Sequence, residues 1–263
     1  MITKDLNEIT REDVVNLCQE TPLSRAICAS FVAQSSDDRF PLLHFNAQFY
    51  VVMHDYLDKL AVRRIQRGKD KAGMPKVTMH EISQEPAHRN QFEQITNWIN
   101  SASIEEQRDV FCIGETGVGK TNFAMNILNE LIKRGFKVHY YDYCLLIYSL
   151  RCLLGTEGYN QKLDEFSKHK AVLLDDFLFR PVLPGEVEIL KDIIDRCHSN
   201  GCSIIITTQV AEKDWKAHLG SGLAVDACID RLCNGPFIVK FAGKSYRSRE
   251  AEHMDINNQQ EEA

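Results

Sequence analysis

The sequence predicts an α/β fold with a doubly wound, mainly parallel sheet, preceded by a small helical N-terminal region. From residue 109 onward, short apolar runs typical of strands alternate with segments whose apolar residues recur at helical spacing. A glycine-rich loop at 114–121 follows the first apolar run and opens a helix, which is the arrangement of a phosphate-binding loop. In such sheets the ligand lies at the carboxyl ends of the strands.

Residues 1–80 are predicted to form the helical N-terminal region. Thr10 and Asp13 have the spacing of a capping box, and Ser24 is a candidate cap for a second short segment. A longer helix is expected over 42–66, apolar at first and basic at its end. It is expected to stop at the helix breakers Gly68, Gly73 and Pro75.

Residues 81–250 are predicted to form a nucleotide-binding domain, and 251–263 a polar tail. The expected strands cover 110–113, 136–141, 171–175, 202–207 and 237–241. After the phosphate-loop helix, further helices are expected over 142–154, 161–168, 186–199 and 226–233. The segment before the first strand carries an amphipathic face formed by Phe92, Ile95, Trp98 and Ile99.

The phosphate-binding loop matches G-x-x-x-x-G-K-[ST] at every required position. It consists of Gly114, Glu115, Thr116, Gly117, Val118, Gly119, Lys120 and Thr121. Lys120 is expected to reach the β- and γ-phosphates of ATP, and the Thr121 hydroxyl to bind Mg²⁺. The alternative, a glycine turn with a chance lysine, is disfavoured because a strand precedes the loop and a helix follows it.

Two carboxylates follow the apolar run 172–174. Asp175 is expected to hold Mg²⁺ directly or through water, and Asp176 to orient or deprotonate the attacking water. Such a pair on its own is usually a polar turn, but its position after a phosphate loop favours the catalytic interpretation. Thr208 and Gln209 end the next strand, where either side chain is placed to contact the γ-phosphate or the water. Ordinary strand-end turn chemistry is the alternative for these two residues.

Composition indicates a cytoplasmic globular protein that is not a membrane protein. The 263 residues are 44% hydrophobic and 26% charged, with a net charge of −6, and their apolar runs are too short to span a bilayer. The N-terminus has no basic region followed by an apolar stretch, so no signal peptide is predicted. The nine cysteines include no C-x-x-C, which favours reduced, mostly buried thiols over a zinc site built from two C-x₄-C pairs.

One stretch departs from the acidic average. Residues 59–76 contain seven Lys or Arg residues and one Asp, a local charge of 7 − 1 = +6. Candidate contacts to the phosphates of double-stranded DNA are Arg63, Arg64, Arg67, Lys69 and Lys71. A solvated helix face with no ligand is an equally favoured alternative, and contact with a protein partner is a third interpretation.

Several segments resemble one family. IIITTQVAEKDW, AVDACIDRLC and FAGKSYR resemble the C-terminal half of IstB-like ATPases, relatives of DnaC-type helicase loaders in the AAA+ class. AVRRIQRGKDKAGMPKVTMHEI resembles the segment that precedes their ATPase domain. The resemblance covers about 60–250, and the first 60 residues show no clear counterpart. It implies a P-loop NTPase fold of the AAA+ type, with adenine contacts near 82–95.

The resemblance also implies roles for two arginines. Arg231 falls on the arginine-finger position, which completes the ATP site of a neighbouring subunit and implies a homo-oligomer in the ATP state; a structural arginine at a helix end is the alternative. Arg247 falls on the last arginine of the closing motif and is a candidate sensor of the γ-phosphate. Many AAA+ proteins have Asp-Glu where this chain has Asp175 and Asp176. The shorter Asp176 is compatible with slow hydrolysis and a long-lived ATP state.

These features together predict a DNA-associated ATPase that helps DNA transposition by assembling on target DNA with ATP and engaging a transposase. One alternative is a DnaC-like loader that grips a replicative helicase. Another is an adaptor that binds ATP without hydrolysing it. A small-molecule kinase is disfavoured because no arginine-rich lid segment follows the fourth predicted strand.

Overall fold

The computed structural model describes residues 10–18, 21–76, 86–102 and 107–242. The chain forms two compact units, Met1–Arg67 and Gly68–Ala263. The division lies within helix α3 (Phe45–Lys71), whereas the sequence places a boundary at 80. The difference arises because the last turn of α3 is anchored in the second unit, where Ala72 is 1% exposed.

The first unit contains only helices. These are α1 (Arg11–Leu17), α2 (Pro22–Gln34), the 3₁₀ helix η2 (Phe40–Leu42) and most of α3. The predicted capping box before α1 is confirmed, because Thr10 Oγ1 accepts from Asp13 N–H at 3.3 Å and Asp13 accepts from Thr10 N–H at 2.8 Å. The prediction of Ser24 as a cap is wrong: Thr21 caps α2, and Ser24 lies one turn inside it.

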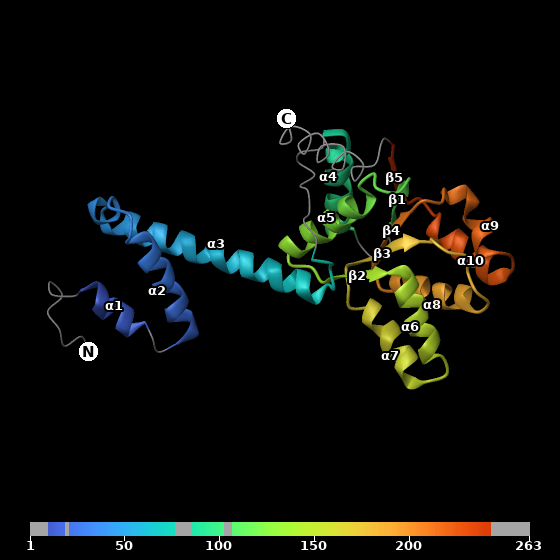
Figure 1. Ribbon diagram of the computed structural model, residues 1–263, viewed down its shortest axis with the longest axis horizontal. Helices are drawn as coiled ribbons and strands as arrows, with labels where there is room; N and C mark the ends of the chain where they lie inside the picture. The colour runs from blue at the N-terminus through green and yellow to red at the C-terminus, as the bar shows by residue number, and fades with distance from the viewer. Residues whose placement is uncertain (1–9, 19–20, 77–85, 103–106, 243–263) are drawn as a thin grey trace, which may run out of the picture. The chain divides into compact units, whose positions relative to one another are not determined.

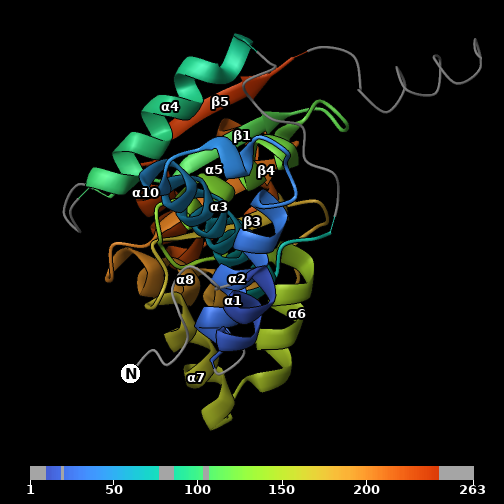
Figure 2. The same cartoon turned by 90° about the vertical axis from the view of Figure 1, so that its left-hand side faces the viewer.

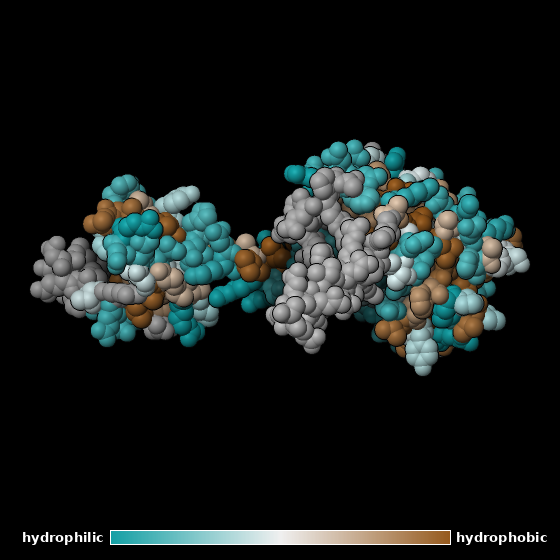
Figure 3. All heavy atoms as spheres, turned by 45° about the horizontal axis from the view of Figure 1, so that its top comes forward, coloured by the Kyte–Doolittle hydropathy of each residue, from teal (hydrophilic) through white to brown (hydrophobic). Residues whose placement is uncertain are grey.

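The first unit buries few large side chains. Its buried apolar residues among those described are Cys28, Phe40 and Val52. Exposed ones include Leu42, Phe45, Phe49, Tyr50, Leu57, Leu60 and Val62, and Figure 3 shows hydrophobic residues at this unit's surface among hydrophilic ones.

Helix α3 continues through Gly68 to Lys71, so the prediction that Gly68 breaks it is wrong. A Cβ atom at Gly68 would lie 2.4 Å from Ile132 Cγ2, so glycine is needed here for close packing on helix α5 (Lys120–Lys133). The helix ends instead before Gly73, whose φ of 66° is the left-handed conformation of a C-terminal cap.

The second unit is built on a five-stranded sheet (Figure 1). Its strands are β1 (Val110–Gly114), β2 (Val138–Asp142), β3 (Ala171–Phe177), β4 (Ser203–Thr208) and β5 (Phe237–Phe241). Every pairing is parallel, in the order β2-β3-β4-β1-β5. The predicted fold class, a parallel α/β sheet preceded by helices, is confirmed.

Helices cover both faces of this sheet. Figure 1 shows α4 (Pro86–Ser101) and α5 on one side, and α6 (Tyr143–Leu153), α7 (Glu157–Phe166) and α8 (Glu186–His198) on the other. Helix α4 runs beside β5, as Figure 2 shows. After β4 come the 3₁₀ helix η4 (Glu212–Asp214), α9 (Trp215–Leu219) and α10 (Leu223–Leu232). Fully buried Trp215 packs against Phe111 and Phe177, with ring centroids 4.6 Å and 5.0 Å away.

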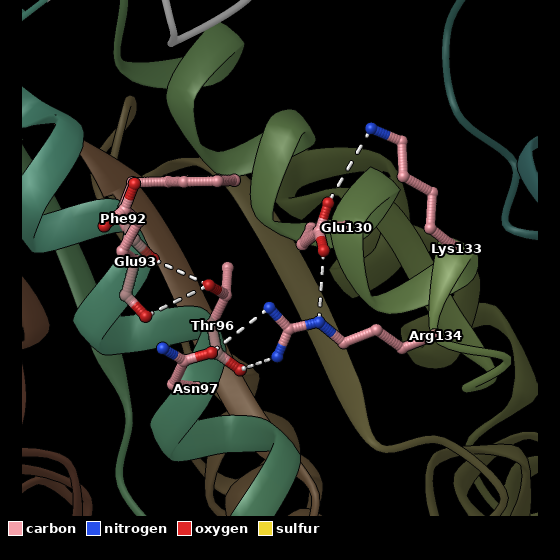
Figure 4. Close-up of polar contacts among 7 residues, drawn as sticks. All are labelled: Phe92, Glu93, Thr96, Asn97, Glu130, Lys133 and Arg134. Carbon is pink, nitrogen blue, oxygen red and sulfur yellow. Dashed lines mark hydrogen bonds and ion pairs between the residues drawn. The ribbon is translucent and has the colours of Figure 1, made fainter.

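One arginine fastens α4 to the phosphate-loop helix α5 (Figure 4). The Arg134 guanidinium donates to Thr96 O at 3.0 Å, to Asn97 Oδ1 at 3.3 Å and to Glu130 Oε1 at 3.1 Å. The Thr96 hydroxyl in turn donates to Phe92 O at 2.9 Å within α4. The bonds to Thr96 and Asn97 hold α4 in place beside α5, the helix that follows the phosphate loop.

Among the described residues, no helix has the length and apolar character that crossing a membrane requires. All nine cysteines are free thiols, and the buried ones are Cys28, Cys112, Cys197, Cys202 and Cys228.

A buried carboxylate ties the start of β1 to β4 and α8. Asp109 is 4% exposed and accepts hydrogen bonds from Ile204 N–H at 2.8 Å and Gln107 Nε2 at 2.9 Å. His198 Nε2 lies 2.9 Å from its second oxygen. Burial raises the pKa of Asp109, while the contacts with His198 oppose that shift.

Asp109→Ala is expected to lower the free energy of unfolding of the second unit by at least about 1–3 kcal/mol, because the buried Ile204 N–H loses its acceptor. Both tryptophans of the chain, Trp98 and Trp215, lie in this unit, so a urea titration followed by tryptophan fluorescence measures it. Asp164→Ala, which removes an exposed ion pair with Arg196, is the control and should shift the midpoint little. Equal shifts for the two variants would contradict the structural role of Asp109.

Candidate nucleotide-binding site

The phosphate loop joins β1 to α5 at the carboxyl edge of the sheet. Gly117 and Gly119 have φ values of 81° and 97°, which L side chains rarely adopt. Gly119 is the N-cap of α5, so the helix begins at Lys120. The N-terminal end of the helix thereby faces the loop, and the first N–H groups of a helix suit an anion.

Lys120 lies beneath the loop rather than in solvent. It is 6% exposed, and its Nζ donates to Glu115 O at 2.6 Å. Burial lowers the pKa of Lys120, and the negative charges of Asp176 and Asp175 oppose this shift. The site therefore holds a buried cation close to two carboxylates, as a site for a phosphate–metal complex requires.

Asp175, at the end of β3, receives hydroxyl groups from three separate elements. Its Oδ1 accepts from Thr121 Oγ1 at 2.9 Å and from Thr207 Oγ1 at 2.5 Å, and its Oδ2 accepts from Tyr140 at 2.9 Å. The carboxylate is 6% exposed, so these donors compensate for the loss of water. Sequence analysis did not single out Thr207 or Tyr140, and only their place on strands that flank β3 reveals them.

A β-bulge lies at the two carboxylates. Leu174 pairs with Ile206 and Phe177 with Thr208, so β3 carries one more residue than β4 over this interval. Asp176, within the bulge, has a φ of 55° and an exposed side chain. Asp adopts this left-handed conformation more readily than Glu. The backbone thus gives a physical reason for Asp at a position where many AAA+ proteins have Glu.

The two strand-end candidates after β4 differ in their surroundings. Thr208 is 1% exposed; its hydroxyl donates to Phe177 O at 2.7 Å and accepts from Val210 N–H at 3.1 Å. Gln209 is exposed at the end of the strand. Thr207, one residue before them, contacts both carboxylate residues, because its Oγ1 also accepts from Asp176 N–H at 3.0 Å. Of the two candidates, Gln209 has the more available side chain.

Of the two candidate arginines, the structure describes Arg231 and not Arg247. Arg231, on α10, is 42% exposed and forms an ion pair with Asp195 of α8. Asp195 also pairs with Lys191 at 2.7 Å. Arg231 therefore contacts α8 in this structure and not the phosphate loop of its own chain. Arg247 lies outside the described residues.

Aromatic rings gather beside the first turn of α5, and two of them, His88 and Phe92, belong to the range 82–95 expected for adenine contacts. Phe92 lies 5.9 Å from Phe123, and His88 lies 4.6 Å from Phe241, between ring centroids. Phe123 and Phe241 are themselves 5.5 Å apart. These residues come from α4, α5 and β5, and residues 82–85 of the expected range lie outside the described part of the chain.

The candidate DNA contacts lie along the basic half of α3. Arg63, Arg64 and Arg67 are exposed in the first unit. In the second unit Lys71 is exposed and Lys69 is half-buried. Lys59, which contributes to the local charge, is paired with Asp55 at 2.6 Å.

The residues present fit a magnesium–nucleotide complex. Mg²⁺ prefers oxygen ligands and usually takes one or two carboxylates together with substrate phosphates. The Thr121 hydroxyl and the Asp175 carboxylate are such ligands, 2.9 Å apart beside the loop. Lys120 would face the phosphates, while Thr121 and Asp175 would hold the metal.

The sequence profile of the IstB-like ATP binding proteins matches residues 23–254. The chain belongs to this family. Its relatives include a candidate ATP-binding protein of insertion sequence IS232 from Bacillus thuringiensis subsp. berliner. The two are 24% identical over 158 residues, which cover 60% of this chain and 63% of that protein. A protein of insertion sequence IS5376 from Geobacillus stearothermophilus is 27% identical over 157 residues, or 60% and 62%. The chain thus spans just over three fifths of the length of these relatives.

Among solved structures, domain III of the Thermotoga maritima replication initiation protein DnaA is similar, with a TM-score of 0.50 and 17% identity. The match covers 63% of the present chain and 67% of the DnaA domain III chain. At this identity the likeness concerns the fold alone, a parallel α/β sheet, which is the class that the sequence predicts. Membership of the family and the geometry of the phosphate loop together support ATP as the ligand.

Lys120→Ala is expected to weaken ATP binding about tenfold or more, because a charge-assisted hydrogen bond contributes roughly 1.5–3 kcal/mol. Lys133→Ala is the matched control, since Lys133 lies on the same helix, is 51% exposed and pairs with Glu130. Titration with a fluorescent ATP analogue measures both affinities. Equal affinities for the Lys120→Ala variant and the unchanged protein would remove Lys120 from the phosphate site.

Proposed function

We propose that this IstB-like protein is an ATPase that assists DNA transposition, assembling on target DNA with ATP and engaging a transposase. The observation that carries the ATPase part is the joining of the phosphate loop to β3, through the bond from Thr121 to Asp175 at 2.9 Å, with Asp176 beside it on a bulge. The transposition part is supported by the family and by relatives named for insertion sequences.

Hydrolysis follows from the position of each group. The loop N–H groups and Lys120 bind the phosphates, and Thr121 and Asp175 hold Mg²⁺, which when bound neutralises phosphate charge. Asp176 has an exposed carboxylate at the end of β3 and orients or deprotonates the attacking water. Gln209, exposed at the end of the neighbouring strand, contacts the γ-phosphate or that water.

A homo-oligomer in the ATP state explains Arg231. Its ion pair with Asp195 is partly exposed, and such pairs contribute about 0–1 kcal/mol. An interaction this weak is readily exchanged for the phosphate of a nucleotide held by a neighbouring copy. Arg231 then acts as the finger in trans that stabilises charge in the transition state.

The basic half of α3 supplies the contact with double-stranded DNA. Its exposed arginines, Arg63, Arg64 and Arg67, are suited to phosphate oxygens and carry no base preference. The exposed apolar side chains of the same unit suit a protein partner, the transposase. Grip on a replicative helicase is the alternative use of this unit.

Asp176→Asn is expected to lower ATP turnover by about 10²–10⁴-fold with ATP affinity nearly unchanged, because the base is lost while Asn still tolerates the left-handed backbone. Asp164→Asn, an exposed carboxylate on α7, is the control. Phosphate release and nucleotide binding are measured for each variant. Normal turnover in Asp176→Asn would mean that another group activates the attacking water. Absence of turnover in the unchanged protein would favour an ATP-gated adaptor.

Replacing Arg63, Arg64 and Arg67 with alanine is expected to weaken binding to all DNA sequences alike and to flatten its salt dependence by about 0.9 per lost phosphate contact. The same three positions changed to lysine form the control, because the charges remain. The measurement is DNA affinity across a salt series by fluorescence anisotropy. An unchanged slope in the alanine variant would identify a solvated helix face, and loss of partner binding alone would favour the helicase-loader function.

A further inference from the structure

Two hydrogen bonds made by one tyrosine connect the last turn of α3 to the carboxylate of Asp175. The backbone N–H of Tyr140 donates to Ala72 O at 2.8 Å, and the Tyr140 hydroxyl donates to Asp175 Oδ2 at 2.9 Å. Tyr140 lies on β2, the strand at one edge of the sheet, and among the described strands β2 pairs with β3 alone. The end of α3 therefore occupies a backbone donor that the edge strand would otherwise leave open.

The turn that carries Ala72 is held in a defined position. Gly73 N–H donates to Asp70 O and Met74 N–H to Lys69 O, both at 3.3 Å, which are the two bonds of a Schellman cap. A Cβ atom at Gly73 would lie 3.4 Å from His139 Nε2 on β2. With the close approach of Gly68 to α5 described above, the turn is packed against both β2 and the phosphate-loop helix.

Tyr140 also limits what Asp175 can bind. A carboxylate has about four lone-pair directions. Thr121 and Thr207 occupy two on Oδ1, and Tyr140 occupies one on Oδ2. The Tyr140 hydroxyl therefore sets the direction in which Oδ2 presents its remaining lone pair. A phenol hydroxyl carries its proton near neutral pH, so Tyr140 remains a donor to Asp175.

We propose that Tyr140 is a positioning residue that couples the last turn of α3, with Lys69 and Lys71, to the metal ligand Asp175. The coupling rests on the proposed function, in which this stretch contacts DNA and Asp175 holds Mg²⁺. Displacement of the turn when DNA binds moves the backbone of Tyr140 and with it the hydroxyl on Asp175. Coupling of this kind is reciprocal: DNA changes nucleotide affinity by the same factor as the nucleotide changes DNA affinity.

The first test is Mg²⁺-dependent nucleotide binding without DNA. Tyr140→Phe removes the hydroxyl but keeps the ring and the N–H that bonds to Ala72. Groups that orient a metal ligand typically change metal affinity about 10–100-fold when removed. The Mg²⁺ concentration for half-maximal binding of a fluorescent ADP analogue should therefore rise about tenfold or more. In EDTA, the affinity of Tyr140→Phe for the same analogue should stay within about twofold of that of the unchanged protein. A general structural defect would instead lower the affinity in EDTA as well.

A second tyrosine provides a matched control. Tyr159 donates to Asp192 Oδ2 at 2.7 Å, between α7 and α8, so it makes the same kind of bond away from the phosphate loop. Tyr159→Phe should leave the Mg²⁺ requirement unchanged. An unchanged or lower Mg²⁺ requirement in Tyr140→Phe, or an equal rise in Tyr159→Phe, would overturn the positioning role.

The second test measures coupling, as the ratio of ADP-analogue affinities with and without saturating double-stranded DNA at saturating Mg²⁺. Typical coupling factors are about 5–150-fold. The ratio should fall toward one in Tyr140→Phe and stay at the unchanged protein's value in Tyr159→Phe. Gly68→Ala places a methyl group against Ile132, near the end of α5 that is far from the phosphate loop; it is expected to displace the turn and should lower the same ratio.

The outcomes separate the coupling from the function on which it rests. A ratio that differs from one in the unchanged protein and is the same in Tyr140→Phe would overturn the coupling while leaving DNA binding intact. A ratio of one in a protein that binds DNA would do the same. Failure to bind DNA at all would contradict the proposed function and the coupling together, and the Mg²⁺ titration would still decide the positioning role of Tyr140.

Discussion

The arrangement of the nucleotide site depends on satisfying one buried carboxylate. An ionised Asp175 without donors is costly in a site from which water is largely excluded, and its three hydroxyl partners come from three elements. Thr121 belongs to the helix that follows the phosphate loop, Thr207 to β4 and Tyr140 to β2. The carboxylate therefore fixes the relative positions of the loop and the strands on both sides of β3.

The bulge in β3 places the second carboxylate at the same edge of the sheet. A regular strand alternates its side chains, so Asp175 and Asp176 would point to opposite faces of the sheet. The extra residue and the left-handed backbone at Asp176 redirect its side chain to solvent at the carboxyl edge. A strained backbone conformation of this kind persists only where neighbouring groups stabilise it. The hydrogen bond from Asp176 N–H to Thr207 Oγ1 is one such stabilising contact.

Sequence alone could predict the features that are local in the chain. The phosphate loop occupies eight consecutive residues, and Asp175 follows its own apolar run, so pattern and spacing locate both. Thr207 and Tyr140 could not be found this way, because their role depends on the strand order β2-β3-β4 and on register. The prediction that Gly68 breaks α3 was wrong for a related reason, because the role of this glycine also depends on a distant residue. In isolation it weakens a helix, whereas in the fold it permits contact with Ile132, which is 64 residues away in the chain.

The charges of this protein fall into two groups that suit different tasks. Lys120 and Asp175 are buried and positioned within one chain, so they provide a preorganised site before any partner arrives. Arg63, Arg64, Arg67 and Arg231 are exposed or held by a partly exposed ion pair, so they exchange partners at little energetic cost. Under the proposed function, nucleotide binding belongs to the single chain, whereas the steps that need the second group require DNA or another subunit. On that proposal the protein responds to ATP first and becomes fully active only in an assembly.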